Sequence, residues 1–307
     1  MSARKPQASA GRARLAVLAT ADETAFRELV VEMLASKQRL DREAALEALV
    51  EHPLPRARDA ARSLYFELDE NGLKLDQGAR QRMPILRYLL ALADLRDIDI
   101  AIRASERVEI LMGDDATYEL RALGLTLLAK IAPDLFPFYA VEHLDDATRY
   151  DDEPAATAIR LLAATNNFVP LYQWLRGSGA NSPNLLRAFD AFSDAPPPIV
   201  RRLVDASIES AIRRQDEALC IALAEAIVNT EMADSYAALA AMVSAKISDD
   251  LYAYLTVLLA GTNRAALLDV LEEQLRHGRR PKLVVEALSI RTTPEQEAIL
   301  TRWREDR

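Results

Sequence analysis

The fold is decided by a pattern that the chain repeats, clearest in LLAATNN at residues 161–167 and VLLAGTN at residues 257–263. Each stretch is an apolar run with helical spacing that ends in a polar turn. Similar turns recur at steps of 29, 36, 32 and 31 residues, marked by Thr165, Asp194, Thr230, Thr262 and Thr293. A helix pair repeated at this spacing cannot bury its apolar stripes alone, so each pair must stack on its neighbours.

The composition indicates a helical chain with a sizeable core. Half of the 307 residues are hydrophobic, whereas glycine contributes only 9. Dinucleotide-binding folds, phosphate-binding loops and all-β folds need glycine in their turns, so its scarcity disfavours all three. Apolar residues keep helical spacing from residue 23 onward, as in the stripe Phe26, Leu29, Val30, Met33 and Leu34. We expect about 15 or 16 helices and no strand.

Residues at the expected helix ends agree with this interpretation. The run Thr293-Pro294-Glu295-Gln296 has the pattern of a capping box at a helix N-terminus. Four of the nine glycines follow apolar runs, where a left-handed C-cap is favoured. These glycines are Gly113, Gly177, Gly261 and Gly278.

The repeated helix pairs resemble the HEAT/armadillo family of α-solenoids. The resemblance covers residues 23–306 and includes a joint with Pro and Asp at Ile131-Ala132-Pro133-Asp134. It implies an all-α fold, a right-handed α-solenoid of about seven or eight stacked antiparallel helix pairs, with residues 22–307 as a single domain. An irregular helical bundle is the alternative. The leucines expected between stacked pairs are Leu123, Leu127, Leu255, Leu258 and Leu271.

The first 21 residues differ from the rest because they contain Arg4, Lys5, Arg12 and Arg14 and no acid. We expect residues 1–21 to form a flexible basic tail, and an organelle transit peptide is the alternative. The single cysteine, Cys220, lies in an apolar run and is expected to be a buried side chain in a reducing compartment. The sequence therefore predicts a cytoplasmic protein without a membrane span.

The charge of the chain argues against nucleic-acid binding. The net charge of −9 is opposite to the basic footprint that duplex-binding proteins carry. The HEAT-like alkylpurine DNA glycosylases have a basic concave face, and the pairs Arg201-Arg202, Arg213-Arg214 and Arg279-Arg280 suggest that comparison. Residues 264–307, however, contain nine bases and eight acids, so this part carries no basic field. Nucleic-acid binding, DNA repair or another activity on the same scaffold is the alternative function.

The histidines give little support to an enzyme. His52, His143 and His277 stand at expected helix ends, where the helix dipole favours a cation. The HEAT-like deoxyhypusine hydroxylases bind iron through repeated His-Glu pairs, whereas this chain has two such pairs in the reverse order. We therefore expect no catalytic residue, cofactor or metal. The prediction is a non-catalytic scaffold that binds another protein.

The most unusual local feature of the sequence is an acidic segment, residues 134–153, which contains seven acids and one base. The candidate partner-binding residues at its centre are Asp145, Asp146, Arg149, Tyr150, Asp151, Asp152 and Glu153. As a loop, this segment would dock a basic surface of another protein, with Tyr150 as an aromatic anchor. The competing interpretation is that these acids are solvated helix ends. Calcium is disfavoured because the mid-loop Gly and final Glu of an EF-hand are missing.

Overall fold

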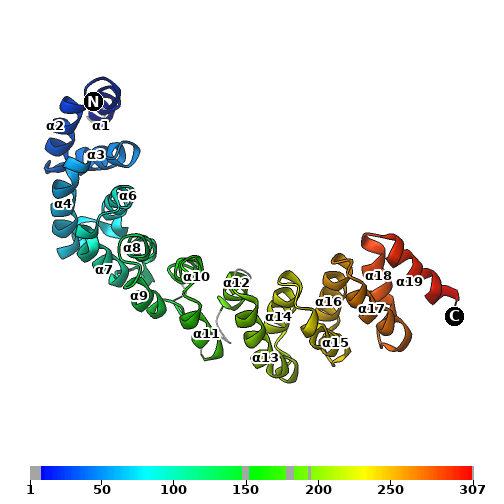
Figure 1. Ribbon diagram of the computed structural model, residues 1–307. Coiled ribbons are helices and arrows are strands. Elements are labelled where there is room, and N and C mark those ends of the chain that lie inside the picture. Colours follow the sequence, from blue (N-terminus) through cyan, green and yellow to red (C-terminus); the bar gives the residue numbers. More distant parts are fainter. Residues whose placement is uncertain (1–7, 147–151, 178–182, 193–194, 306–307) are drawn as a thin grey trace. The chain divides into compact units, whose positions relative to one another are not determined.

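The computed structural model describes residues 8–146, 152–177, 183–192 and 195–305. These residues form 19 α-helices, a few 3-10 turns and one two-stranded sheet. The chain divides into two compact units, residues 1–167 and 168–307. Within each unit, a helix packs mostly against helices that are close to it in sequence (Figure 1). The predicted all-α class is confirmed, with the small sheet as an exception.

The first unit holds the sheet and the helices up to residue 164. Its described helices are α1 (Ala8–Ala21), α2 (Glu23–Leu34), α3 (Arg39–Glu51), α4 (Arg58–Glu70), α5 (Gly72–Leu75), α6 (Arg82–Leu92), α7 (Ile98–Glu106), α8 (Tyr118–Ile131), α9 (Phe136–Glu142) and α10 (Ala155–Ala164). The strands, β1 (Ile110–Leu111) and β2 (Asp114–Asp115), lie between α7 and α8.

The second unit contains only helices among its described residues. They are α11 (Phe168–Arg176), α12 (Leu185–Ala191), α13 (Pro197–Arg214), α14 (Glu217–Asn229), α15 (Tyr236–Ser244), α16 (Asp249–Gly261), α17 (Ala265–His277), α18 (Pro281–Ile290) and α19 (Pro294–Glu305). The capping box predicted at the start of α19 is confirmed. The Gln296 amide N–H donates to Thr293 Oγ1, and the Thr293 N–H donates to Gln296 Oε1 at 3.2 Å.

Much of the segment expected to be a flexible tail is helical. Residues 8–21 form α1, which packs on α2 and α3, and Leu15 is buried. Arg12 forms an ion pair with Glu47 at 2.7 Å. Residues 1–7 lie outside the described residues.

Three of the five predicted turns share one geometry, whereas Thr293 caps the start of α19 and Asp194 lies outside the described residues. Helices α10, α14 and α16 each end at a threonine whose hydroxyl donates to a backbone carbonyl three or four residues earlier. The next residue in each case has a positive φ between 51° and 59°. The threonines and the residues that follow them are Thr165-Asn166, Thr230-Glu231 and Thr262-Asn263.

Hydrogen bonds of several long side chains join segments that lie 36 to 40 residues apart in sequence. In the second unit, Arg264 donates to the Val228 carbonyl at 2.8 Å and Gln296 donates to the Ala260 carbonyl at 2.8 Å, each 36 residues apart. In the first unit, Lys130 donates to the Leu90 carbonyl, 40 residues away. Both units therefore contain side-chain bonds between segments 36 to 40 residues apart.

The predicted core is confirmed in part. Leu127, Leu255 and Leu271 are fully buried, whereas Leu123 and Leu258 are only half-buried. These two leucines therefore lie at the margin of the buried face of their helices. Their neighbours Leu125, Leu128 and Leu259 take the fully buried places, because each helix packs against helices on two sides and buries a wider face than a single stripe.

The prediction that four glycines end helices in the left-handed conformation was wrong. Of these four glycines, only Gly113 has a positive φ, and it lies in the turn between β1 and β2. Gly261 is the last residue of α16, and Gly278 caps α17 in an extended conformation. Left-handed residues at described helix ends are instead Ala93, Asn166, Gln215, Glu231 and Asn263.

The hairpin was not predicted, because two residues per strand are too few to show an alternating pattern. Ile110 pairs with Asp115 and Leu111 pairs with Asp114 in antiparallel register. Thr117 closes the base of the hairpin: its hydroxyl donates to the Arg107 carbonyl at 2.9 Å and accepts from the Glu109 N–H at 3.0 Å.

A buried cluster of ion pairs connects the hairpin to helices α4, α5 and α6. The Arg82 guanidinium is fully buried and lies 3.1 Å from Asp69 Oδ1, 3.1 Å from Asp76 Oδ2 and 2.8 Å from Glu109 Oε1. Gly72 leaves room for this cluster, since a Cβ atom there would lie 2.0 Å from Glu109 Oε1. The cluster thus joins the ends of α4, α5 and α6 to β1.

Candidate functional site

The acidic segment flanks a stretch of chain outside the described residues, which includes Arg149, Tyr150 and Asp151. The structure places Asp145 and Asp146 just after α9. Asp152 and Glu153 precede α10. Four of the seven candidate residues can therefore be placed. They lie beside the ends of two helices of the first unit, as both interpretations of the segment expected.

Asp146 is bound to the body of the first unit. Its Oδ2 lies 2.8 Å from His143 Nδ1 and 3.7 Å from Arg121 Nη2. Arg121 also pairs with Asp115 of the hairpin. The hydrogen bond from His143 and the charge of Arg121 lower the pKa of the Asp146 carboxyl, against the opposing effect of partial burial. This carboxylate therefore stabilises the fold locally.

Glu153 also has a local structural role. One carboxylate oxygen accepts from the Thr157 N–H at 3.0 Å, and the other accepts from the Thr157 hydroxyl at 3.0 Å. The Asp152 carbonyl accepts from the Ala156 N–H at 2.9 Å. These bonds satisfy the first turn of α10, where backbone donors otherwise lack partners.

An exposed apolar surface on α9 lies next to these acids, and the sequence did not reveal it. Phe138 is 71% exposed and Val141 is also exposed, whereas Phe136 on the same helix is fully buried. Phe138, Val141 and Glu142 lie at positions i, i+3 and i+4, so they share one face of the helix. The two phenylalanines look alike in sequence, and only the packing of α9 on α8 and α10 distinguishes them.

The charges around this α9 surface are acidic. Asp134 lies four residues before Phe138, and Asp134, Glu142 and Asp145 are all exposed. The only basic side chain from 134 to 146 is His143, which is buried against Asp146. We call Phe138, Val141, Asp134, Glu142 and Asp145 the α9 surface. Such an apolar centre with a charged rim is the composition of a protein-binding patch.

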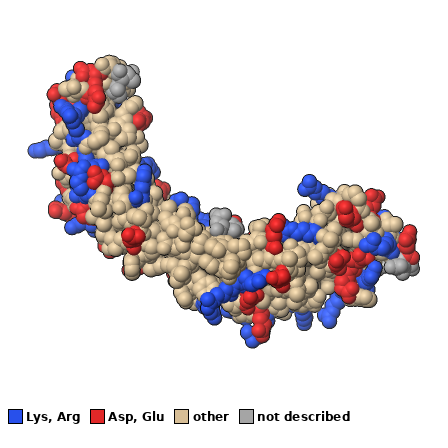
Figure 2. Space-filling model, in the orientation of Figure 1, with Lys and Arg blue, Asp and Glu red and all other residues tan. Residues whose placement is uncertain are grey.

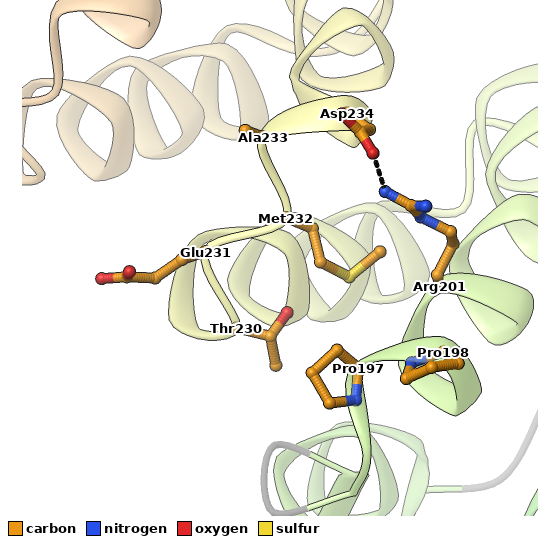
Figure 3. Close-up of a pocket in the computed structure, with 8 residues that line it drawn as sticks. All are labelled: Pro197, Pro198, Arg201, Thr230, Glu231, Met232, Ala233 and Asp234. Carbon is orange, nitrogen blue, oxygen red and sulfur yellow. Dashed lines mark hydrogen bonds and ion pairs between the residues drawn. The ribbon is translucent and has the colours of Figure 1, made fainter.

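The second unit contains a hollow of about 450 Å³ between the start of α13 and the turn after α14. Pro197 and Pro198 form one side, and Met232 lies between them and an ion pair of Arg201 with Asp234 (Figure 3). Glu231, also on the rim, pairs with Arg264 at 2.7 Å. Because both rim acids are engaged by arginines, the hollow offers mainly an apolar wall to a ligand.

Two members of the arginine pairs suggested by the sequence are opposed by acids, and a third lies over an aromatic ring. Arg201 pairs with Asp234, and Arg280 pairs with Asp249 at 2.6 Å. The Arg202 guanidinium lies 5.8 Å from the centre of the Tyr172 ring. On the face that Figure 2 shows, basic and acidic side chains of both units are interleaved.

The residues with metal-binding or nucleophilic chemistry are dispersed. Within the described ranges, no three His, Cys, Asp or Glu side chains come together as a metal site would require. Cys220 is buried and unpaired, and burial raises the pKa of its thiol to about 11. In the described part of the chain, none of the helices is both long and apolar enough to cross a membrane.

The chain matches no known protein-family description, and a comparison with curated proteins finds no match.

Proposed function

We propose that this chain is a non-catalytic scaffold built as a HEAT-like α-solenoid, which binds a basic partner protein through the α9 surface and the acidic segment 145–153. The observation that carries the proposal is the exposure of Phe138 close to the exposed acids Asp134 and Glu142. Phe138 and Val141 are exposed together on one face of α9, and an exposed apolar patch with a polar rim marks an interaction site.

The repeat supports the solenoid part of the proposal. The shared Thr-centred turns and the bonds between residues 36 to 40 apart are what stacked helix pairs produce. In a solenoid, each pair contacts only its neighbours, so long surfaces stay available to a partner. A cytoplasmic location is part of the same proposal, since the one cysteine is buried and unpaired.

At the α9 surface, the acidic charges would speed association and the apolar side chains would slow dissociation. Acids at both ends of α9 attract a basic surface over the distance at which salt screens charges, about 8–10 Å at physiological ionic strength. Phe138 and Val141 then lose their contact with water and slow dissociation. Glu142 is better suited to this attraction than Asp146, because Asp146 already bonds to His143.

A photo-crosslinking experiment tests the proposal directly. A photoreactive phenylalanine analogue is placed at position 138 of the full chain and, as a control, at Val169, which is also 71% exposed. We expect one protein in the native lysate to crosslink from position 138 and not from position 169. The purified crosslinked protein must then bind the unmodified chain with an affinity that falls as salt rises.

Substitutions in the purified pair separate the two contributions. Asp134→Lys combined with Glu142→Lys should slow association at least tenfold, whereas Phe138→Ser should mainly speed dissociation. Glu28→Lys combined with Glu32→Lys on α2 changes the net charge equally and is the matched control. If both double variants bind alike, the α9 surface is not the docking site and the proposal fails.

A further inference from the structure

The hairpin between α7 and α8 carries a side chain that neither packing nor turn geometry explains. Met112 and Gly113 form its two-residue turn, with φ of +54° and +94°. Turns with two positive φ angles favour Asn, Asp or Gly at both positions, and a methionine there is strained. Met112 is also 99% exposed, so its thioether contributes nothing to the core.

Met112 continues a row of apolar side chains on one face of the hairpin. Val108 is 53% exposed and Ile110 is 57% exposed, while Glu109 between them is buried in the Arg82 cluster. Side chains at alternate positions of a strand share a face, so Val108 and Ile110 point the same way and Met112 extends their row at the tip. The position of Glu109 does not require exposed apolar side chains at these three positions, so the row has no evident structural role.

The outer edge of β1 has free backbone groups. The Ala116 N–H donates to the Glu109 carbonyl at 2.8 Å, and Leu111 and Asp114 pair across the turn. Because hydrogen-bonding direction alternates along an antiparallel strand, Ile110 directs its N–H and carbonyl away from β2. Val108 lies two residues earlier, just before β1 begins, where continued alternation would point its backbone groups the same way. Within the described chain, no hydrogen bond from outside the strand pair reaches either residue.

The base of the hairpin is rigid before any partner arrives. Besides the Arg82–Glu109 ion pair and the two Thr117 bonds, Arg107 Nε donates to Asp69 Oδ1 at 2.9 Å. Arg121 pairs with Asp115 on the other strand. A binding edge that is held in place in this way loses little conformational entropy when a partner binds.

The charges beside the hairpin indicate which partner fits. Glu106, Asp114 and Glu119 are exposed and form no ion pair with the described chain. The arginines of the same stretch lie within 4 Å of a carboxylate, namely Arg103, Arg107 and Arg121. Among the charged residues from 103 to 121, those without an ion pair are therefore acidic. A second copy of this chain would bring the same acids together, so the complement is a basic segment.

We propose that the outer edge of β1 binds an extended, basic segment of a partner protein, which adds to the hairpin as a third strand. Main-chain bonds to Val108 and Ile110 would provide the affinity, and apolar side chains at alternate positions of the segment would lie beside Val108, Ile110 and Met112. This surface is separate from the α9 surface, and the proposal does not depend on docking there.

The test uses the full chain and a capped synthetic peptide in which four lysines alternate with three valines. We expect saturating peptide to slow hydrogen exchange at the Val108 and Ile110 amides at least tenfold. The same peptide N-methylated on its protein-facing amides should not do so, because it keeps the side chains and loses the donors. Unchanged exchange at both amides with saturating unmodified peptide would overturn the proposal.

Two substitutions distinguish a loss of peptide binding at the β1 edge from a loss of folding stability. Ile110→Lys should weaken peptide binding at least tenfold, whereas Ile290→Lys, at an exposed isoleucine of α18, should leave it unchanged. Met112→Asn improves the turn, so it should keep the thermal stability and still weaken binding. Equal affinity of Ile110→Lys and the wild type would overturn the proposal. So would a concentration-dependent dimer that Ile110→Lys abolishes, because the edge would then belong to a second copy.

Discussion

Arg82 and Glu109, 27 residues apart in sequence, form a buried ion pair in which Nη2 and Oε1 lie 2.8 Å apart. This pair joins the first turn of α6 to β1, and two further carboxylates, Asp69 and Asp76, complete the cluster. An arginine suits this position because its planar guanidinium can donate to several carboxylates at once. The cluster thereby holds Glu109, the residue before β1, next to the ends of α4 and α5 and the start of α6.

Replacing Arg82 with leucine should therefore be strongly destabilising. The substitution leaves the buried Asp76 and Glu109 without their cation, whereas Asp69 keeps Arg107. Removal of one partner from a buried ion pair costs about 3–5 kcal/mol. Urea unfolding of the purified chain measures the loss. Arg96→Leu is the control, because Arg96 is exposed and pairs with Asp94 at the surface. We expect a far smaller effect there, and equal losses would show that the Arg82 cluster does not hold the fold.

Gly72→Ala tests how tightly the cluster is packed. The added methyl group would lie 2.0 Å from Glu109 Oε1 and 2.5 Å from Arg82 Nη2, so the ion pair must move. Overpacking of this kind costs about 1–3 kcal/mol. Gly261→Ala is the opposite case: its Cβ meets nothing within 4 Å at the end of α16. That substitution should be neutral or stabilising by about 0.5–1 kcal/mol. Thermal melting of both variants gives the comparison.

Leu127→Ala and Leu123→Ala compare two leucines of α8. Leu127 is fully buried, so its truncation should cost about 2–5 kcal/mol from lost apolar contact and the cavity left behind. Leu123 is only half-buried, so the same change should cost clearly less. Both values come from denaturant unfolding of the single variants. A larger loss at Leu123 would contradict the packing of α8.

Asp146→Asn should change how stability depends on pH. The pKa of Asp146 is lowered from its ordinary value of 3.8, mainly by the hydrogen bond from His143 and also by the charge of Arg121. A carboxyl whose pKa is depressed on folding stabilises the protein above its unfolded-state pKa and loses that contribution as pH falls. The stability difference between wild type and variant should therefore be largest near neutral pH and shrink below about pH 4.

The matched control for this experiment is Asp134→Asn, at an exposed carboxylate on the other side of α9. Unfolding free energies of both variants are measured from pH 3 to pH 7. A difference for Asp146→Asn that stays constant over this range would show that the His143–Asp146 bond does not depend on the carboxylate charge.

Features that depend on neighbours in sequence were predictable. The Thr293–Gln296 capping box and the turns at Thr165, Thr230 and Thr262 formed where they were expected. Helix capping involves residues three positions apart, and an apolar stripe repeats every three or four positions. Interactions between residues this close in sequence can be recognised from the sequence pattern itself. The all-helical class and most helix positions followed from them.

Tertiary structure alone decided which of two similar residues is buried and which charges meet. Phe136 and Phe138 are two positions apart, yet one lies in the core and the other in water. Arg82 lies 13 residues from Asp69 and 27 residues from Glu109 in sequence, so no local sequence pattern predicts their cluster. The α9 surface and the free edge of β1 arise in the same way. Each is set by where other helices stop covering the chain, which depends on packing between segments far apart in sequence.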